Sequence, residues 1–231
     1  MAHASGSTEA WEPLDKSGSS ERHQFKDATV ADPPTTSLHT TNPFSTRFIK
    51  PGAAPYLFPR GESAGQLLVR LKRCGWWGEI VGPHGSGKST LLKLLCGQLK
   101  AGGLHVVPVT IAAGLPFDLT PVWQCTSGPA MIVIDGFEQL NAWQRWGVRR
   151  HCRRQRLGLL VTCHRTTGLP SLHRTCPTAQ VAIALVGRLT AADPGVISPA
   201  EVTAAFHAKN GNLREALFQL YDLYEERRSL R

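Results

Sequence analysis

The stretch Gly82-Pro83-His84-Gly85-Ser86-Gly87-Lys88-Ser89 decides the fold of this 231-residue chain. Its three glycines let the backbone approach a phosphate without a side-chain clash. Their amides then converge on the anion together with the N-terminus of the following helix. Lys88 supplies a positive charge to the β- and γ-phosphates, and the Ser89 hydroxyl is a magnesium ligand. We therefore expect this loop, with the adjoining Thr90, to hold ATP or GTP with Mg2+.

Apolar segments on both sides of the loop alternate in the manner of an α/β domain. Strands that alternate with helices imply a doubly wound parallel sheet, here with five strands and a short helical C-terminal lid. The expected strands are 78–81, 104–111, 130–134, 157–162 and 180–186, and the expected helices are 62–73, 89–99, 141–155, 199–208 and 213–228.

Composition divides the chain into three parts. Residues 1–42 are rich in Ser, Thr, Pro and charge, and we expect them to be disordered because they bury too little surface to offset the ordering entropy. Residues 43–189 are the expected nucleotide-binding domain, in which 48–60 holds three prolines and reads as an extended, packed arm. Residues 190–231 form the expected helical lid.

Two carboxylates follow the most apolar segment of the chain. Ala130 to Ile134 is typical of a strand buried on both faces, and Asp135 comes directly after it. Ligands bind at the carboxyl ends of parallel strands, so Asp135 is the expected second magnesium residue beside Ser89, directly or through water. Glu138 is the nearest candidate for polarising an attacking water. The alternative for Glu138 is an exposed acid favoured by a helix N-terminus.

A second polar segment, Thr162-Cys163-His164-Arg165, follows the expected strand 157–162. Thr162 at this end of the sheet is expected to contact the γ-phosphate or the attacking water. His164 and Arg165 are further candidates for the same role. The alternative is a loop without a function.

Together with Gly211-Asn212-Leu213-Arg214-Glu215-Ala216-Leu217, these motifs resemble the AAA+ ATPases and the related STAND signalling ATPases. The resemblance covers about residues 75–228. It implies that Arg214 is a lid arginine that reaches the γ-phosphate, and the alternative for Arg214 is a surface arginine without a role. With Lys88 of the glycine loop and Glu138 after the apolar strand, Arg214 completes the expected set of catalytic residues. Gly136 stands where AAA+ proteins place a glutamate, and the Asp135-Gly136-Phe137-Glu138 spacing is closer to the D-G-x-D of STAND and NACHT ATPases.

The net charge of +9 is concentrated in one region. Residues 139–192 contain no Asp or Glu but carry nine arginines, which predicts a negatively charged partner, either nucleic acid or an acidic protein. Arginines recur at helical spacing on the expected helix 141–155 and just beyond it: Arg145, Arg149, Arg153 and Arg156. They are interpreted as a stripe that binds nucleic-acid phosphates, or as the source of an arginine finger for a neighbouring subunit in a homo-oligomer. The third interpretation is a solvated face. Trp143, Trp146 and Val148 are expected on the buried side of that helix.

Several function classes remain from the sequence. The first is an ATP hydrolase that works as a switch or motor, the second is a nucleotide-gated binding module with little hydrolysis, and the third is a P-loop kinase of a small molecule. An ABC transporter subunit is disfavoured because the chain has no L-S-G-G-Q stretch, and the lack of an N-K-x-D motif favours ATP over GTP.

The location expected from composition is cytoplasmic. No apolar run reaches the ~18 residues that span a bilayer, and the first residues lack a signal-peptide pattern. The six scattered cysteines form no C-x-x-C pair, which is typical of reduced thiols in a cytosolic protein.

Overall fold

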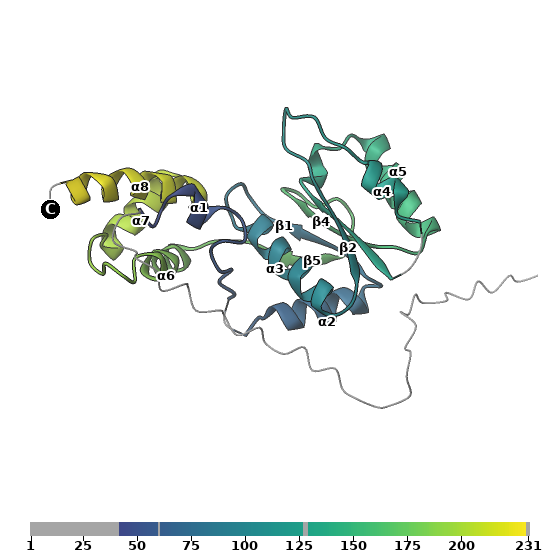
Figure 1. Cartoon of the computed structure of the whole chain (residues 1–231), viewed down its shortest axis with the longest axis horizontal. Helices are drawn as coiled ribbons and strands as arrows, with labels where there is room; N and C mark the ends of the chain where they lie inside the picture. The colour runs from purple at the N-terminus through teal and green to yellow at the C-terminus, as the bar shows by residue number, and fades with distance from the viewer. Residues whose placement is uncertain (1–41, 60, 127–128, 230–231) are drawn as a thin grey trace, which may run out of the picture.

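A computed structural model describes residues 42–59, 61–126 and 129–229 of the chain (Figure 1). Its centre is a five-stranded parallel sheet with the strand order β2-β3-β4-β1-β5. The strands are β1 (Trp77–Val81), β2 (His105–Thr110), β3 (Ala130–Asp135), β4 (Gly158–Cys163) and β5 (Ser171–Arg174). The predicted doubly wound parallel sheet of five strands is therefore confirmed.

Helices cover both faces of this sheet because the side chains of each strand alternate between two cores. Along β3, Met131 and Val133 pack into one core with α2 (Ala64–Arg73) and α3 (Lys88–Ala101). Ile132 and Ile134 pack into the opposite core with α4 (Thr120–Gln124) and α5 (Ala142–Arg154). Successive side chains of a strand point to opposite faces of the sheet, so a strand buried on both sides supplies both cores.

Three helices at the C-terminal end form a separate apolar cluster beside the sheet (Figure 1). They are α6 (Ala179–Leu189), α7 (Pro199–Ala208) and α8 (Leu213–Ser229). Phe44, which lies just before the short α1 (Thr46–Ile49), is fully buried in this cluster with its ring against Tyr224. The N-terminal arm of the described chain is thus packed against the lid.

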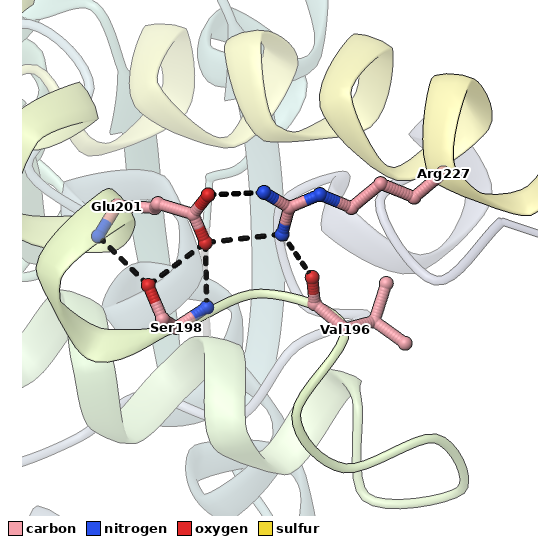
Figure 2. Close-up of polar contacts among 4 residues, drawn as sticks. All are labelled: Val196, Ser198, Glu201 and Arg227. Carbon is pink, nitrogen blue, oxygen red and sulfur yellow. Dashed lines mark hydrogen bonds and ion pairs between the residues drawn. The ribbon is translucent and has the colours of Figure 1, made fainter.

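A polar network joins α7 to α8. Ser198 and Glu201 form a capping box at the start of α7, and Arg227 from α8 reaches both the Glu201 carboxylate and the Val196 carbonyl (Figure 2). The capping box gives hydrogen-bond partners to amides at the start of α7, and Arg227 gives one to the Val196 carbonyl just before that helix. The network therefore holds the two lid helices at a set angle.

Most expected elements are confirmed within one or two residues, including both lid helices, but the fifth strand is wrong. Residues 180–186 belong to α6, which Thr178 caps by accepting a hydrogen bond from the Val181 amide. Ala182, Leu185 and Val186 are its buried side chains, at helical spacing. A short apolar run does not by itself distinguish a strand from a helix. The fifth strand is instead β5, which pairs with β1.

The expected packing of α5 is wrong at two positions. Val148 is buried, but Trp143 and Trp146 are 81% and 57% exposed. The helix ends at Arg154, and Arg156 follows its C-cap with φ +53, so Arg156 does not share a helical stripe with the other arginines. The apolar side of α5 is narrow because Cys152 and Val148 alone fill it.

The expected disorder of residues 1–42 falls, apart from Asn42, outside the described residues. Asn42 itself is buried, with its side-chain amide donating to the Tyr221 carbonyl. The boundary between domain and lid at residue 190 stays a prediction; the apolar cluster of the lid helices already includes Ala179 and Ala182 of α6.

Candidate nucleotide-binding site

The glycine loop connects the carboxyl end of β1 to the first residue of α3. Gly85 and Gly87 have φ values of +68° and +91°, a region that L side chains rarely adopt. Gly87 is the N-cap of α3, and it has no side chain to accept from the first amides of that helix. Those amides are therefore available to an anion, as in helix N-terminal phosphate sites.

Two further contacts brace the loop from β5 and the lid. A Cβ on Gly82 would lie 2.0 Å from the Thr175 hydroxyl, and that hydroxyl is 2.5 Å from the Ser86 Oγ. A Cβ on Gly85 would lie 1.8 Å from the side-chain oxygen of Asn212, which also caps the start of α8 by accepting from the Glu215 amide. Close approach thus requires glycine at both positions, and Gly85 is required by its conformation as well.

The Lys88 ammonium folds back over the loop. Its Nζ donates to the carbonyls of Gly82 and Pro83 at 2.8 and 2.7 Å. Burial lowers the pKa of Lys88, while the nearby carboxylates of Glu138 and Asp135 oppose that shift. The ammonium is therefore held at the mouth of the loop, where a phosphate can replace the carbonyls as its acceptor.

Asp135 is positioned by the neighbouring strand. Thr162 at the end of β4 donates its hydroxyl to Asp135 Oδ1 at 2.5 Å and accepts from the Gly136 amide at 2.9 Å. In this structure Thr162 therefore orients the carboxylate. Ser89 and Asp135 line the same cavity, and their oxygen atoms are the hard donors that Mg2+ prefers. These two residues fit a magnesium ion that also takes phosphate oxygens and water.

Glu138 lies in the short 3-10 turn η2 (Phe137–Gln139) and faces β4. Its Oε1 is 3.1 Å from His164 Nδ1, and its Oε2 is buried with no hydrogen-bond partner among the described residues. The His164 ring in turn lies on His84 of the glycine loop, with centroids 3.7 Å apart. Burial lowers the pKa of His164, and Glu138 opposes that shift, so the imidazole is neutral at pH 7.

One cavity brings most of these groups together. Its polar side is formed by the glycine loop, Asp135, Glu138, Thr162 and His164, and Arg214 reaches it from the lid. Thr90 also lines it, whereas Arg165 is exposed and does not. Its apolar side comes from the N-terminal arm, α6 and α8. The apolar lining residues are Ile49, Pro51, Ala54, Pro55, Leu57, Pro59, Val181, Leu185, Leu213 and Leu217.

A polar chain that the sequence did not indicate runs along this cavity. The Tyr56 hydroxyl is 2.9 Å from His173 Nε2, and His173 Nδ1 is 3.0 Å from Glu62 Oε2. Burial raises the pKa of Tyr56 to about 12, so its hydroxyl stays protonated. The Tyr56 ring also lies beneath Gly87. These residues come from three distant segments, and only the packed prolines of the arm gave a signal for one of them.

The glycine loop between β1 and α3, with an aspartate at the end of β3 in a parallel sheet, decides the fold family. This is a P-loop NTPase fold. Site roles for individual P-loop residues remain predictions, but the structure brings Lys88, Ser89, Asp135, Glu138 and Arg214 to one cavity.

Comparisons with known sequences give a short match. No protein-family profile matches the chain. The hemin import ATP-binding protein HmuV of Vibrio cholerae is 58% identical over 31 residues, which are 13% of this chain and 12% of that protein.

Two solved structures resemble the chain partially. A point mutant of RuvB from Thermotoga maritima gives a TM-score of 0.49 at 14% identity, covering 69% of this chain and 60% of that one. PCH-2 of C. elegans gives a TM-score of 0.30 at 14% identity, covering 65% and 61%. The chain thus spans less than two thirds of either structure.

Clustered metal ligands and membrane-spanning helices are both absent from the part of the chain that the structure describes. Within the described ranges, no group of three His, Cys, Asp or Glu side chains is placed to hold a metal ion. A magnesium site of the P-loop kind needs only one or two protein ligands beside the phosphates. In the same ranges, no helix has both the length and the apolar character to cross a membrane.

Proposed function

We propose that this chain is a magnesium-dependent ATPase that acts as an AAA+/STAND-like switch or motor module. The observation that carries this proposal is the convergence of Lys88, Asp135, Glu138 and Arg214 on the cavity at the glycine loop. ATP is preferred over GTP because of the resemblance and the missing guanine motif. A homo-oligomeric assembly stays a prediction.

Binding would use the loop and the arm. The amides at the start of α3 would hold the phosphates, and Lys88 would exchange its two carbonyl acceptors for phosphate oxygens. The base would lie against the apolar side of the cavity, between the arm and the lid helices. A bound nucleotide would thus contact both the sheet domain and the lid.

Hydrolysis would use Glu138 as the general base. Mg2+, held by Ser89 and Asp135, would offset charge on the phosphate oxygens when bound. The free, buried Oε2 of Glu138 would accept the proton of the attacking water. His164 would be a positioning residue, because its ring nitrogen fixes the other oxygen of that carboxylate.

Arg214 would couple the position of the lid to the presence of the γ-phosphate. It lies in the first turn of α8, two residues after Asn212, whose side chain touches Gly85 of the loop. A cation at a helix N-terminus is mildly disfavoured by the dipole, and an adjacent phosphate would remove that penalty. The lid would therefore shift when the γ-phosphate leaves.

A nucleotide-gated binding module with little hydrolysis is the second candidate. The His164–Glu138 contact favours it, because it occupies one of the two oxygens of the proposed base. In either case the arginines of α5 would contact a polyanionic partner, nucleic acid or an acidic protein.

Steady-state ATP turnover separates these candidates and tests the proposal. We expect magnesium-dependent turnover in the wild type and a loss of at least about tenfold in both turnover and ATP affinity for Lys88→Ala, since a charged hydrogen-bond partner is removed. Lys72→Ala, on an exposed position of α2, is the matched control and should change neither quantity. Undiminished turnover in Lys88→Ala would refute the ATPase.

A further inference from the structure

The outer face of α5 combines exposed aromatic rings with positive charge. Trp143 and Trp146 are the two most exposed of the chain's tryptophans among the described residues, and their ring centroids lie 6.4 Å apart at 82°. Arg150 and Arg154 follow them at spacings of four residues, which continues one face of a helix. The Arg150 guanidinium lies 5.4 Å from the Trp146 ring centroid.

Two other arginines of α5, Arg149 and Arg153, contact the rest of the protein. Arg149 donates to the Thr167 carbonyl at 2.5 Å and lies over the Phe137 ring, and the Thr167 amide and hydroxyl both donate to the buried Glu79 carboxylate. Arg153 lies over the Trp77 ring. These contacts fasten α5 to the sheet, so the exposed face is presented on a rigid support.

No carboxylate neutralises the exposed arginines. Within the described ranges, none forms an ion pair with Arg150 or Arg154, and residues 139–192 contain no Asp or Glu. Two exposed indole rings lower solubility without adding to the core, and two guanidinium groups without ion-pair partners among the described residues lie beside them. Such a surface is complementary to a ligand that carries both negative charge and flat apolar faces.

We infer that this face of α5, Trp143, Trp146, Arg150 and Arg154, binds single-stranded nucleic acid. Unpaired bases stack on the indole rings, and the guanidinium groups contact the phosphates between them. A duplex hides the faces of its bases, and an acidic peptide has none, so neither uses the tryptophans. A membrane surface needs a broad apolar face, whereas Val148 and Cys152 of α5 are buried in the core and the two tryptophans are its large exposed apolar side chains.

This surface is connected to the proposed catalytic residue. α5 starts only four residues after Glu138, and Phe137 beside Glu138 packs under Arg149. A nucleic-acid strand bound along α5 would therefore lie close to η2. The inference names the partner of the proposed ATPase, but the binding itself needs neither nucleotide nor hydrolysis.

Binding is tested with the full chain, without nucleotide, by fluorescence anisotropy of a labelled 20-nucleotide oligo-dT. We expect Trp143→Ala and Trp146→Ala each to weaken binding by at least about fivefold, because stacking on an aromatic side chain is lost. Phe at the same positions should restore most of the affinity. Leu115→Ala, an exposed apolar residue elsewhere, is the matched control and should bind as the wild type does.

The phosphate contacts are tested by salt dependence. In the double variant Arg150→Gln/Arg154→Gln, the slope of log affinity against log salt concentration should become shallower by about 1.4, since each single-strand phosphate contact contributes about 0.7. The control Lys72→Gln/Arg73→Gln removes the same charge from exposed positions of α2 and should keep the wild-type slope.

Any of the following results would overturn the inference. The first is an equal change of the salt slope in the α2 control, and the second is equal affinity for a 20-base-pair duplex. The third is equally effective competition by poly-glutamate, which would point to an acidic protein. The fourth is equally effective competition by phosphatidylserine vesicles. Absence of binding at 50 mM salt would also overturn it. ATP affinity and turnover of the α5 variants without DNA should equal those of the wild type, so a failed ATPase and a failed nucleic-acid site give different results.

Discussion

His164 Nδ1 lies 3.1 Å from Glu138 Oε1, so an imidazole at the end of β4 holds the carboxylate proposed as the catalytic base. The same imidazole packs on His84 of the glycine loop. Three groups that could respond to a nucleotide are therefore in direct contact. The strength of the central contact depends on the protonation state of His164.

The first prediction concerns the pH dependence of turnover. Burial lowers the pKa of His164, so it is neutral at pH 7 and becomes charged only at a pH below that of a free imidazole. The charged form binds the Glu138 carboxylate more tightly, so turnover should fall as the pH drops below the ordinary pKa range of an imidazole. In His164→Ala this acid limb should flatten, with ATP affinity changed by less than about threefold. His207→Ala, on the exposed side of α7, is the control; parallel profiles of wild type and His164→Ala would contradict the prediction.

A second prediction concerns the contact between the glycine loop and the lid. Gly85→Ala places a methyl group 1.8 Å from the Asn212 oxygen at a φ of +68°, so the Asn212 side chain must move and its cap on α8 is disturbed. We expect ATP affinity to fall by at least about tenfold, measured by equilibrium titration with a fluorescent ATP analogue. The same substitution at Gly97 of α3 meets open space and should stabilise the helix by about 0.5–1 kcal/mol. Equal affinities of Gly85→Ala and Gly97→Ala would show that the contact is unimportant.

Arg214 provides a third prediction. If it reaches the γ-phosphate, Arg214→Gln should lower turnover by at least about tenfold and weaken ATP binding more than ADP binding. Arg188→Gln, at an exposed position near the end of α6, removes the same charge away from the cavity. Equal loss of ATP and ADP affinity in Arg214→Gln would assign this arginine a structural role.

The network between α7 and α8 gives a prediction about stability (Figure 2). Hydrogen bonds from Arg227 and then from Ser198 lower the pKa of Glu201 to about 2. A carboxyl group whose pKa is lower in the folded state stabilises the fold at any pH above its unfolded-state pKa of about 4.3. This contribution is lost as the pH falls toward 2. The melting temperatures of wild type and Glu201→Gln should therefore differ most at pH 6–7 and converge near pH 2. A constant difference across that range would contradict the linkage.

Much of the fold follows from local patterns. The glycine loop, the apolar run of β3 and the lid helices were predictable because each signal is contained in one segment. β5 was missed because its four residues include one apolar side chain, Leu172, and its pairing with β1 depends on tertiary structure. α6 was assigned as a strand because a short apolar run fits both periods. The exposure of Trp143 could not be anticipated, since it depends on how little of α5 meets the sheet.

Within the site, the residues of the glycine loop and Asp135 were predictable from a motif and a strand end. The contacts of Thr175, Asn212 and Tyr56 with the loop were not, because they join segments far apart in the sequence. The pairing of His164 with Glu138 was also missed, although both residues were candidates. Long-range side-chain contacts leave no periodic signal in one sequence.

The most direct test of the account is ATP turnover of the wild type beside Glu138→Gln, with ATP affinity measured in both. If Glu138 is the general base, turnover should fall by at least about 100-fold while ATP affinity stays within about threefold. Turnover in Glu138→Gln equal to that of the wild type would contradict the assignment of the base. Negligible turnover in both proteins, with ATP still bound, would contradict the ATPase and leave a nucleotide-gated binding module.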